Sequence, residues 1–358
     1  MQVFLNYINS YILRLWCFVR HCYLFAEKFW FKHSRLLCGP VRIKINTGYR
    51  CNLRCPLCPT GRRVSGNSRD LTIDDVHFFL SRLGTFYYVS LFGWAESFLV
   101  RDIFKIIKLL KKNGKIIDID SNLNIKEEEI IKQIEKSELD LLSVSLDGID
   151  QDSYSTYRYG GQFELVIRNS KRLRKVASGP KRIEWQYLVS KKNIQHIEKA
   201  KEMAKGLGIS ICLEDIGMYL DMFYENTNQL EQEWRTDEQM ERKRYFCKLG
   251  EVCMYMYNDP FIDPDGRVYP CCNAAHAPKS LLEKGYENVF GNLHDNTLFE
   301  IWNKEYYQAM RCLFGRRKYK GENVKPICLM CKVYFDSRGI SPDWRPIFNG
   351  NTVQVSSV

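Results

Sequence analysis

The sequence has no long uncharged apolar run. No stretch of about 18 uncharged residues occurs, and a membrane-spanning helix requires one of that length. A cleavable signal peptide is not expected, because the N-terminus lacks a basic leading region and Arg14 and Arg20 interrupt the apolar segment. These absences predict a cytoplasmic protein, with a peripheral position at the inner membrane surface as the alternative.

The cysteine content does not suit a small secreted disulfide scaffold, because 14 cysteines are spread over 358 residues. In a reducing cytoplasm, clustered cysteines are expected to bind metal. The formal net charge of +11 permits binding to anionic substrates, nucleic acid or a membrane surface, and chooses none of them. Nucleic acid is not favoured, because no recognised binding module accompanies the basic excess.

Residues 1–38 form an aromatic and basic extension. Their large apolar side chains recur at spacings of three and four, as in an amphipathic helix. Such a helix packs on the rest of the protein or on a partner. Alternatively, it lies in the headgroup region of an anionic membrane.

After Pro40 the sequence alternates between strand-like and helix-like segments. Strands are expected at 41–46, 86–92, 115–120, 140–146, 183–189 and 209–214. Helices are expected near 72–83, 99–113, 125–137, 162–177 and 193–206. Gly84, Gly114 and Gly208 stand where helix-to-strand turns need them. This order predicts an α/β fold with a parallel sheet, and a partial (β/α)6 TIM-like barrel fits it better than a closed eight-stranded barrel.

The composition also suggests how the chain divides. The expected parts are the N-terminal extension 1–38, the barrel 39–215, a charged connector 216–246, a small cysteine-rich domain 247–338 and a C-terminal tail 339–358. The tail from Ser341 has no clear periodicity and is expected to be a loop.

A first cysteine group, Cys51, Cys55 and Cys58, follows the first expected strand directly. Three thiolates at this spacing can hold an iron-sulfur cubane and leave one iron open. An open metal position admits a chelating small molecule. A structural zinc or redox site is the less favoured alternative, because zinc needs a fourth ligand nearby and the next histidine is His77.

The segment CNLRCPLCP resembles the CxxxCxxC signature of the radical S-adenosylmethionine (SAM) superfamily, and the likeness extends over residues 41–215. In that family the fold is a partial (β/α)6 barrel. The resemblance implies that the three cysteines hold a [4Fe-4S] cluster that binds SAM. It also implies a reductant such as flavodoxin or ferredoxin.

Shorter segments after the later strands continue this resemblance. Phe92-Gly93-Trp94-Ala95-Glu96 is similar to the family's GGE-type motif, whose backbone receives the SAM amino group, although alanine replaces the usual glycine and requires φ < 0. Asp120-Ser121-Asn122 resembles the SAM-ribose motif, and Ser145-Leu146-Asp147-Gly148 the family's SLDG segment. If the family resemblance is set aside, the SLDG segment is interpreted as a helix-capping turn and Arg158 as a solvated surface charge. The implied SAM contacts are Gly93, Ala95, Glu96, Ser121, Asn122, Ser145 and Arg158, the last two on the SAM carboxylate.

A second cysteine group lies downstream. Cys253 and Cys271 flank FIDPDGRVYP, which reads as a β-hairpin, and Cys328 and Cys331 form a CxxC pair. Two such pairs supply four thiolates and a closed site. Cys247 in place of Cys253, Cys272 in place of Cys271, and a zinc ribbon remain alternatives.

This second group resembles the SPASM/twitch modules that follow many radical SAM barrels. The match includes Cys-x12-Gly-x4-Cys, the doubled Cys271-Cys272 and the later Gly291-Asn292-Leu293. Because no cysteine follows Cys331, the shorter twitch form with one auxiliary [4Fe-4S] cluster is favoured.

The resemblance implies that a 5′-deoxyadenosyl radical from SAM abstracts hydrogen from an unactivated carbon. The leading hypothesis is an oxidoreductase acting on a sugar, aminocyclitol or other small metabolite, by dehydrogenation or epimerisation. Maturation of a ribosomally made peptide is the runner-up, since residues 1–38 are too short for a peptide-gripping winged-helix domain. The non-enzymatic alternative is a zinc-stabilised binding protein. No catalytic residue is identified, and Asn46, Glu184, Gln186 and Asp215 are weak candidates for substrate contact.

Overall fold

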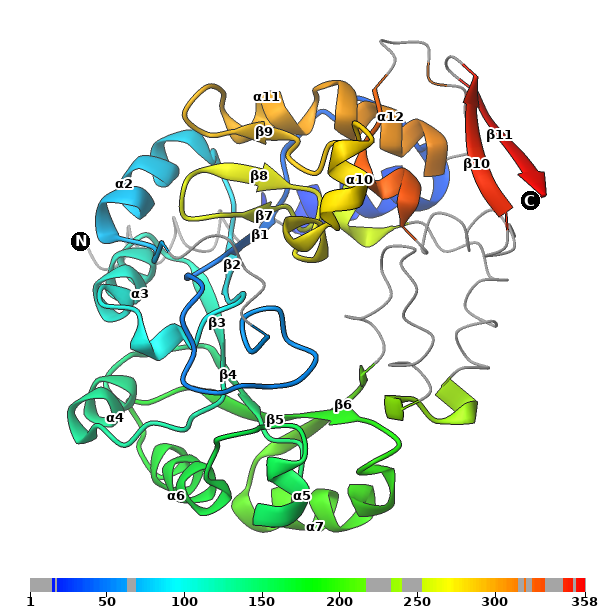
Figure 1. The fold of residues 1–358 in the computed structure, drawn as a ribbon. Coiled ribbons are helices and arrows are strands. Elements are labelled where there is room, and N and C mark those ends of the chain that lie inside the picture. Colours follow the sequence, from blue (N-terminus) through cyan, green and yellow to red (C-terminus); the bar gives the residue numbers. More distant parts are fainter. Residues whose placement is uncertain are drawn as a thin grey trace, which may run out of the picture.

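A nine-stranded sheet forms the centre of the molecule (Figure 1), with strand order β6-β5-β4-β3-β2-β1-β7-β8-β9. The computed structural model describes residues 15–16, 18–62, 69–216, 233–239, 253–314, 319, 324–331, 344–349 and 352–357. Cys247 and most of the connector 216–246 lie outside these residues.

The first six strands are parallel and curve into a partial barrel with its helices on the outer face (Figure 1). They are β1 (Arg42–Ile45), β2 (Tyr88–Leu91), β3 (Ile116–Ser121), β4 (Leu141–Ser145), β5 (Arg182–Val189) and β6 (Ser210–Asp215). The main helices are α2 (Ile73–Arg82), α3 (Ile103–Lys112), α4 (Glu128–Glu135), α6 (Phe163–Arg174) and α7 (Ile197–Leu207). The predicted fold class is confirmed.

Alternation along the strands explains why this sheet has an apolar and a polar face. Ile43, Val89 and Ile117 are paired side by side on neighbouring strands, and all three are fully buried in the main core. The next row along the same strands is Lys44, Ser90 and Asp118. Because side chains alternate between faces, the polar row points the opposite way, into the barrel.

Local signals place the ends of the helices. Thr72 and Asp75 form a reciprocal capping box at the start of α2. Gly84, Gly114 and Gly208 all have a φ near +69°, so the predicted helix-to-strand turns are confirmed at these three positions. The sequence analysis missed the short helix α5 (Gln151–Ser155), which begins at its own capping residue.

The cysteine-rich part continues the barrel sheet instead of forming a separate one. The predicted hairpin is confirmed as β7 (Phe261–Ile262) and β8 (Arg267–Tyr269), and β9 (Gly291–Asn292) pairs with β8. Strand β7 also pairs in parallel with β1. The remaining elements of this part are η5 (Met254–Met256), η6 (Asn273–His276), α10 (Lys279–Glu283), α11 (Leu298–Trp302), α12 (Glu305–Phe314) and η7 (Ile327–Met330).

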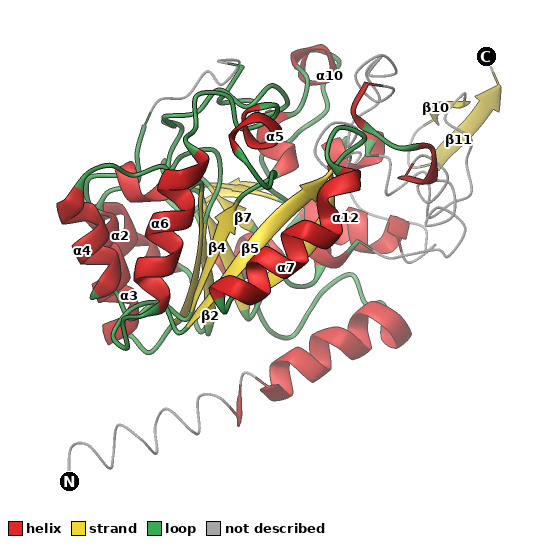
Figure 2. Cartoon of the chain, turned by 90° about the horizontal axis from the view of Figure 1, so that it is seen from below, coloured by secondary structure: helices red, strands yellow, loops and turns green. Residues whose placement is uncertain are grey.

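The N-terminal helix lies outside the barrel (Figure 2) and runs into the turn η1 (Glu27–Phe31). Arg20 is buried and donates to the carbonyl oxygens of Thr85 and Gly39. Other side chains of the helix point to solvent, including Phe18 (64% exposed) and Trp30 (70% exposed). Among the described helices, none has the length and apolarity to cross a bilayer.

The tail differs from the expected loop. Strands β10 (Trp344–Asn349) and β11 (Thr352–Ser357) form an antiparallel pair of their own. The expectation was wrong for these residues because it gave no weight to Gly350-Asn351, the dipeptide between the paired Asn349 and Thr352 and one typical of tight hairpins.

Candidate functional site

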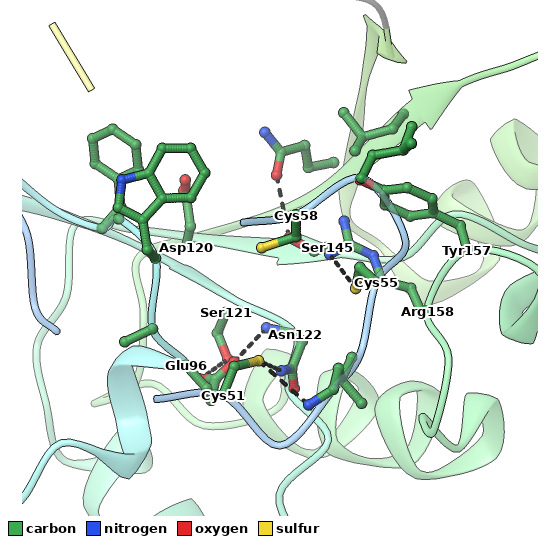
Figure 3. Close-up of a pocket in the computed structure, with 18 of the residues that line it drawn as sticks. Cys51, Cys55, Cys58, Glu96, Asp120, Ser121, Asn122, Ser145, Tyr157 and Arg158 are labelled. Atoms are coloured by element: carbon green, nitrogen blue, oxygen red, sulfur yellow. Dashed lines mark hydrogen bonds between the residues drawn. The ribbon is translucent and has the colours of Figure 1, made fainter. Parts of the chain in front are cut away.

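A cavity lies at the carboxyl ends of the barrel strands, where the loops after β1, β2 and β4 meet the ends of β3 and β5 (Figure 3). All three cysteines of the first group line it, and so do all seven residues that the family resemblance assigns to SAM. Tyr157, Leu188 and Asp120 line it as well, although the resemblance assigns none of them a contact with SAM and includes Asp120 only as part of the Asp120-Ser121-Asn122 motif.

Two of the three cysteine thiols, those of Cys51 and Cys55, receive N–H donors from the surrounding loops. The amide Nδ2 of Asn122 lies 3.5 Å from the sulfur of Cys51, and the backbone N–H of Leu53 lies 3.4 Å from the same atom. A guanidinium N–H of Arg158 lies 3.8 Å from the sulfur of Cys55. Hydrogen bonds of this kind stabilise thiolates that bind iron.

Burial raises the pKa of Cys51 to about 12, with the nearby Glu96 as the next contribution. Burial likewise raises the pKa of Cys55, and the charge of Arg158 opposes that shift. A positive metal centre is therefore needed to hold these groups as thiolates at neutral pH.

A single ion and a cubane make different demands on the positions of their ligands. In the part of the chain that the structure describes, no three His, Cys, Asp or Glu side chains converge on one ion position. Zinc requires such convergence, because its ligands surround one atom. A cubane does not, because each cysteine binds a different iron.

Glu96 holds two of the cavity loops together. Its fully buried carboxylate accepts hydrogen bonds from the Ser121 hydroxyl and the Asn122 backbone N–H, both at 2.7 Å (Figure 3). Burial raises the pKa of Glu96, and these donors oppose the shift. Glu96 therefore fixes the loop after β2 against the end of β3.

The loop after β2 needs glycine at one position and tolerates alanine at another. Gly93 has φ +156°, and a Cβ atom there would lie 2.1 Å from the Asn46 Oδ1 atom. Ala95 is not among the described residues with positive φ. Ala95 therefore meets the requirement for φ < 0 that alanine has at this position of the family motif. The position that has no room for a side chain is Gly93.

Arg158 is held by an ion pair inside the protein, and its side chain is only 13% exposed. Its Nε atom lies 2.5 Å from an oxygen of Asp147, whose other oxygen accepts from the Leu188 N–H. The neighbouring Asp147 raises the pKa of Arg158 well above its usual value. Arg158 is thus not a solvated surface charge, and SLDG does more than cap a helix.

The second cysteine group gathers around the hairpin β7–β8 and the turn η7. Cys271, Cys328 and Cys331 are each more than nine-tenths buried, and Cys253 is half-buried. Burial and the charges of Cys271, Cys331 and Cys253 raise the pKa of Cys328. The four cysteines that the spacing selects are therefore close enough for their charges to act on one another.

Cys272 faces a different way from its neighbour. It lines the cavity of the first group, and its pKa is raised by burial and lowered by the charge of Lys44. Cys271 thus faces the second group, while Cys272 reaches the first site.

Asp120 lies across the cavity from Cys55 and Arg158 (Figure 3). Burial raises the pKa of Asp120 to about 7, and the charges of Asp118 and Glu214 add to the shift. A carboxyl group with a pKa near neutrality is suited to proton transfer. The sequence signals for it were its place at the end of a barrel strand and its membership of the Asp120-Ser121-Asn122 motif.

The other candidates for substrate contact have different positions. Gln186 lines the cavity and links the Ser145 hydroxyl, at 3.3 Å, to Glu214, at 3.1 Å. Asp215 accepts a hydrogen bond from Gln239, and Asn46 is fully buried. Of the weak candidates, only Gln186 is among the residues that line this cavity.

Two protein-family models match the chain. The radical SAM superfamily matches residues 45–204, and SPASM, an iron-sulfur cluster-binding domain, matches residues 253–332. The chain is a radical SAM enzyme with a SPASM domain. It therefore uses SAM and [4Fe-4S] clusters. This result favours the enzyme over the zinc-stabilised binding protein.

The similar curated proteins act on different molecules. The AdoMet-dependent heme synthase of Methanosarcina barkeri is 23% identical over 79% of this chain and 88% of its own length. The tungsten-containing aldehyde ferredoxin oxidoreductase cofactor-modifying protein of Pyrococcus furiosus is 21% identical over 79% of this chain and 85% of its own length.

Solved structures share the fold. Streptococcus suis SuiB bound to S-adenosylmethionine has a TM-score of 0.59 at 17% identity, over 85% of this chain and 73% of its own. The enzyme anSMEcpe with bound AdoMet and Cp18Cys peptide has a TM-score of 0.54 at 18% identity, over 77% of this chain and 83% of its own. These likenesses concern the fold alone.

Proposed function

We propose that Cys51, Cys55 and Cys58 hold the [4Fe-4S] cluster that binds SAM in this radical SAM enzyme. The support is their common position at one cavity, with N–H donors to two of the sulfurs. When bound, this cluster supplies one electron to SAM, which then yields methionine and a 5′-deoxyadenosyl radical. The protein must orient SAM and exclude water around it.

The proposed SAM contacts surround the same cavity. The backbone of Gly93 and Ala95 would receive the amino group, and Ser121 and Asn122 would hold the ribose. Ser145 and Arg158 would bind the SAM carboxylate. The observation that supports this role for Arg158 is its buried ion pair with Asp147, which keeps a cation aimed at the cavity without competing solvent.

The second proposal is that Cys253, Cys271, Cys328 and Cys331 hold one auxiliary [4Fe-4S] cluster, as in the twitch form. Four thiols in one buried site are a closed set, with no open position for substrate. Cys272 is then not a ligand, because it lines the cavity of the first site.

For the reaction we propose oxidation of a small metabolite, with a sugar or aminocyclitol as the favoured substrate class. The observation that carries this proposal is Asp120, a carboxyl group that lines the cavity and lies across it from Cys55 and Arg158 (Figure 3). Abstraction of a hydrogen atom from a carbinol carbon by the 5′-deoxyadenosyl radical would leave a carbon radical. That radical would become a carbonyl by passing one electron to the auxiliary cluster and releasing the hydroxyl proton. Asp120 is the cavity carboxylate suited to accept it.

Peptide maturation is the second candidate. SuiB has been solved with its precursor peptide SuiA, and anSMEcpe with the Cp18Cys peptide, and both share this fold. A separate recognition protein would supply peptide binding in this case.

The first experiment tests the class of chemistry. The chain is purified and reconstituted anaerobically, and iron, sulfide and zinc are measured. Dithionite and SAM are then added, and 5′-deoxyadenosine is quantified. The proposal expects two clusters for each chain and production of 5′-deoxyadenosine; zinc in both sites, or clusters without SAM cleavage, would contradict it.

The second experiment tests the substrate class. Source cells are grown in deuterated medium, and their extract is separated into small-molecule and peptide fractions. Transfer of deuterium into 5′-deoxyadenosine marks the fraction that contains the substrate. The small-metabolite proposal expects this transfer from the small-molecule fraction, and transfer from the peptide fraction alone would reject it.

We also propose that the N-terminal helix docks on an anionic membrane surface. Its inner side is fixed by Arg20, whereas Phe18, Phe25 and Trp30 face outward. Lys32 and Arg35 follow at its end and would contact anionic headgroups. An exposed apolar face flanked by basic residues is better suited to contact with an anionic membrane than to exposure to water.

A further inference from the structure

The SPASM domain and the barrel meet where β1 and β7 end. Ile45 is paired with Ile262, and the Asn46 N–H donates to the Ile262 carbonyl at 2.8 Å. The next residues, Asn46 and Asp263, therefore leave the two strands side by side. Both are fully buried, and the Asn46 Nδ2 atom donates to the Asp263 Oδ1 atom at 2.7 Å.

Asp263 has polar partners in both parts of the protein. The Tyr49 hydroxyl donates to Oδ1 at 2.6 Å, and the Arg267 guanidinium lies 3.3 Å from Oδ2. Burial raises the pKa of Asp263, and the hydrogen bonds from Tyr49 and Asn46 oppose that shift. A buried carboxylate of this kind fixes the orientation of its donors, because losing a partner would leave a charge unsatisfied.

The other end of the Asn46 amide touches the loop after β2. The Asn46 Oδ1 atom accepts from the Trp94 N–H at 3.3 Å and from the Gly48 N–H at 3.2 Å. The same oxygen occupies the space where a side chain on Gly93 would be. Asn46 therefore contacts the backbone to which the proposed function assigns the SAM amino group.

The amide of Asn46 has only one orientation that satisfies all these contacts. Its NH₂ group must face Asp263, since a carboxylate only accepts, and its oxygen must then face Trp94 and Gly48. The Asp263 carboxylate therefore fixes which atom of the Asn46 amide faces the loop 93–96, to which the proposed function assigns SAM.

We propose that Asp263 of the SPASM domain is a positioning residue for SAM, acting through Asn46 on the loop 93–96. This inference rests on the proposed function, which assigns SAM to that loop. It adds that SAM affinity depends on a side chain of the SPASM domain that does not line the cavity. A residue that merely joined the two domains would change stability and leave SAM affinity alone.

The test compares SAM affinity in reconstituted full-length variants by equilibrium dialysis with labelled SAM. For Asp263→Asn, the dissociation constant of SAM is expected to rise about tenfold, because the Asn46 amide loses its fixed orientation. The matched control is Asp265→Asn on the same turn, whose carboxylate pairs with Arg267 at 2.7 Å. Its SAM affinity is expected to stay within about twofold of the wild type.

A charge-swapped double variant, Asn46→Asp with Asp263→Asn, supplies the rescue. The new amide at 263 can donate to the carboxylate at 46, which can still accept from Trp94 and Gly48. Affinity within about threefold of the wild type is expected. If Asp263→Asn alone does not fold, the SAM affinity of the double variant still tests the inference.

Two results would overturn the inference: a folded Asp263→Asn variant that binds SAM like the wild type, or a folded double variant that binds as weakly as the single one. An equal loss in Asp265→Asn would also count against it, since that result indicates a general effect of the turn. A wild-type protein that holds clusters but does not bind SAM would instead refute the proposed function.

Discussion

The two cysteine groups use the same side chain in opposite settings. Cys51, Cys55 and Cys58 lie on one loop, and this loop packs in a small apolar cluster apart from the main core. Cys253, Cys271, Cys328 and Cys331 come from three segments, and the hairpin and η7 cysteines are part of the main core. One group borders a cavity, and the other is enclosed.

This difference shows that access is decided by the backbone, not by the ligand type. A single loop at the mouth of a barrel can surround only one side of a cluster, so a position remains for SAM. Cys271, Cys328 and Cys331 come from the segments of a hairpin and a turn and are more than nine-tenths buried, and Cys253 is partly buried. The first group is therefore suited to chemistry, and the second to electron transfer and stability.

The largest expected effect comes from the open group. Cys55→Ala should lower formation of 5′-deoxyadenosine at least about 1000-fold, because the cluster loses a ligand and SAM its binding position. Iron should fall from about eight to about four atoms per chain. Cys22→Ala, at an exposed cysteine, is the control and should behave like the wild type. Undiminished SAM cleavage in Cys55→Ala would remove the distinction between the groups.

The enclosed group should respond mainly in stability. Cys331→Ala should lower the free energy of unfolding by roughly 3–5 kcal/mol, since it disrupts a metal site inside the core. Thermal denaturation under anaerobic conditions measures this loss, and the folded fraction should still cleave SAM. A Cys331→Ala protein as stable as the wild type would show that these thiols do not hold a cluster.

The pH dependence of stability tests the polar side of the open cavity. Burial holds the pKa of Asp120 at about 7 in the folded chain, above its unfolded value, so ionisation disfavours folding. The wild type should therefore lose stability as the pH rises from about 4 to about 7. Asp120→Asn should be more stable than the wild type by roughly 2–4 kcal/mol at pH 8, with no gain near pH 4.

Thermal denaturation at the two pH values checks this prediction. Asp152→Asn on the exposed helix α5 is the control and should show no such gain. Equal effects of Asp120→Asn at both pH values would mean that its carboxyl titrates normally, and the proposed proton acceptor would be lost.

The smallest effect is expected far from both groups. A Phe18→Glu, Trp30→Glu double variant should bind anionic liposomes about tenfold more weakly, because it places charge on the proposed docking face. Phe299→Glu changes an exposed aromatic residue on α11 and is the matched control. Cosedimentation with vesicles gives the comparison, and unchanged binding of the double variant would reject the membrane proposal.

The barrel was predictable because each strand and helix has its own signal. Alternation on the strands, apolar spacing on the helices and turn glycines such as Gly84 all agree with one another. The junction was not predictable, because the parallel pairing of β1 with β7 joins residues more than 200 positions apart. Asn46 looked like a substrate contact for that reason, although its partner is Asp263.

Within the site, the sequence motifs predicted which residues line the cavity, but they did not predict what each side chain does there. The motif pattern selected Glu96 as a family feature, but only the fold reveals that its carboxylate ties Ser121 to the loop. The sequence alone cannot decide which of the adjacent residues Cys271 and Cys272 belongs to the second group. The structure places Cys272 at the cavity and Cys271 near Cys328. Burial raises the pKa of Asp120, and the charges of Asp118 on the same strand and of Glu214 on β6 add to the shift; the burial and the approach of Glu214 come from the fold.

The most direct test of the difference between the two cysteine groups is an electron paramagnetic resonance titration of the reduced protein with SAM. The spectrum of Cys331→Ala, which keeps the three-cysteine group, should change when SAM is added. The spectrum of Cys55→Ala, which keeps the four-cysteine group, should stay the same. A SAM-dependent change in Cys55→Ala, or none in Cys331→Ala, would contradict the assignment of an open and a closed cluster.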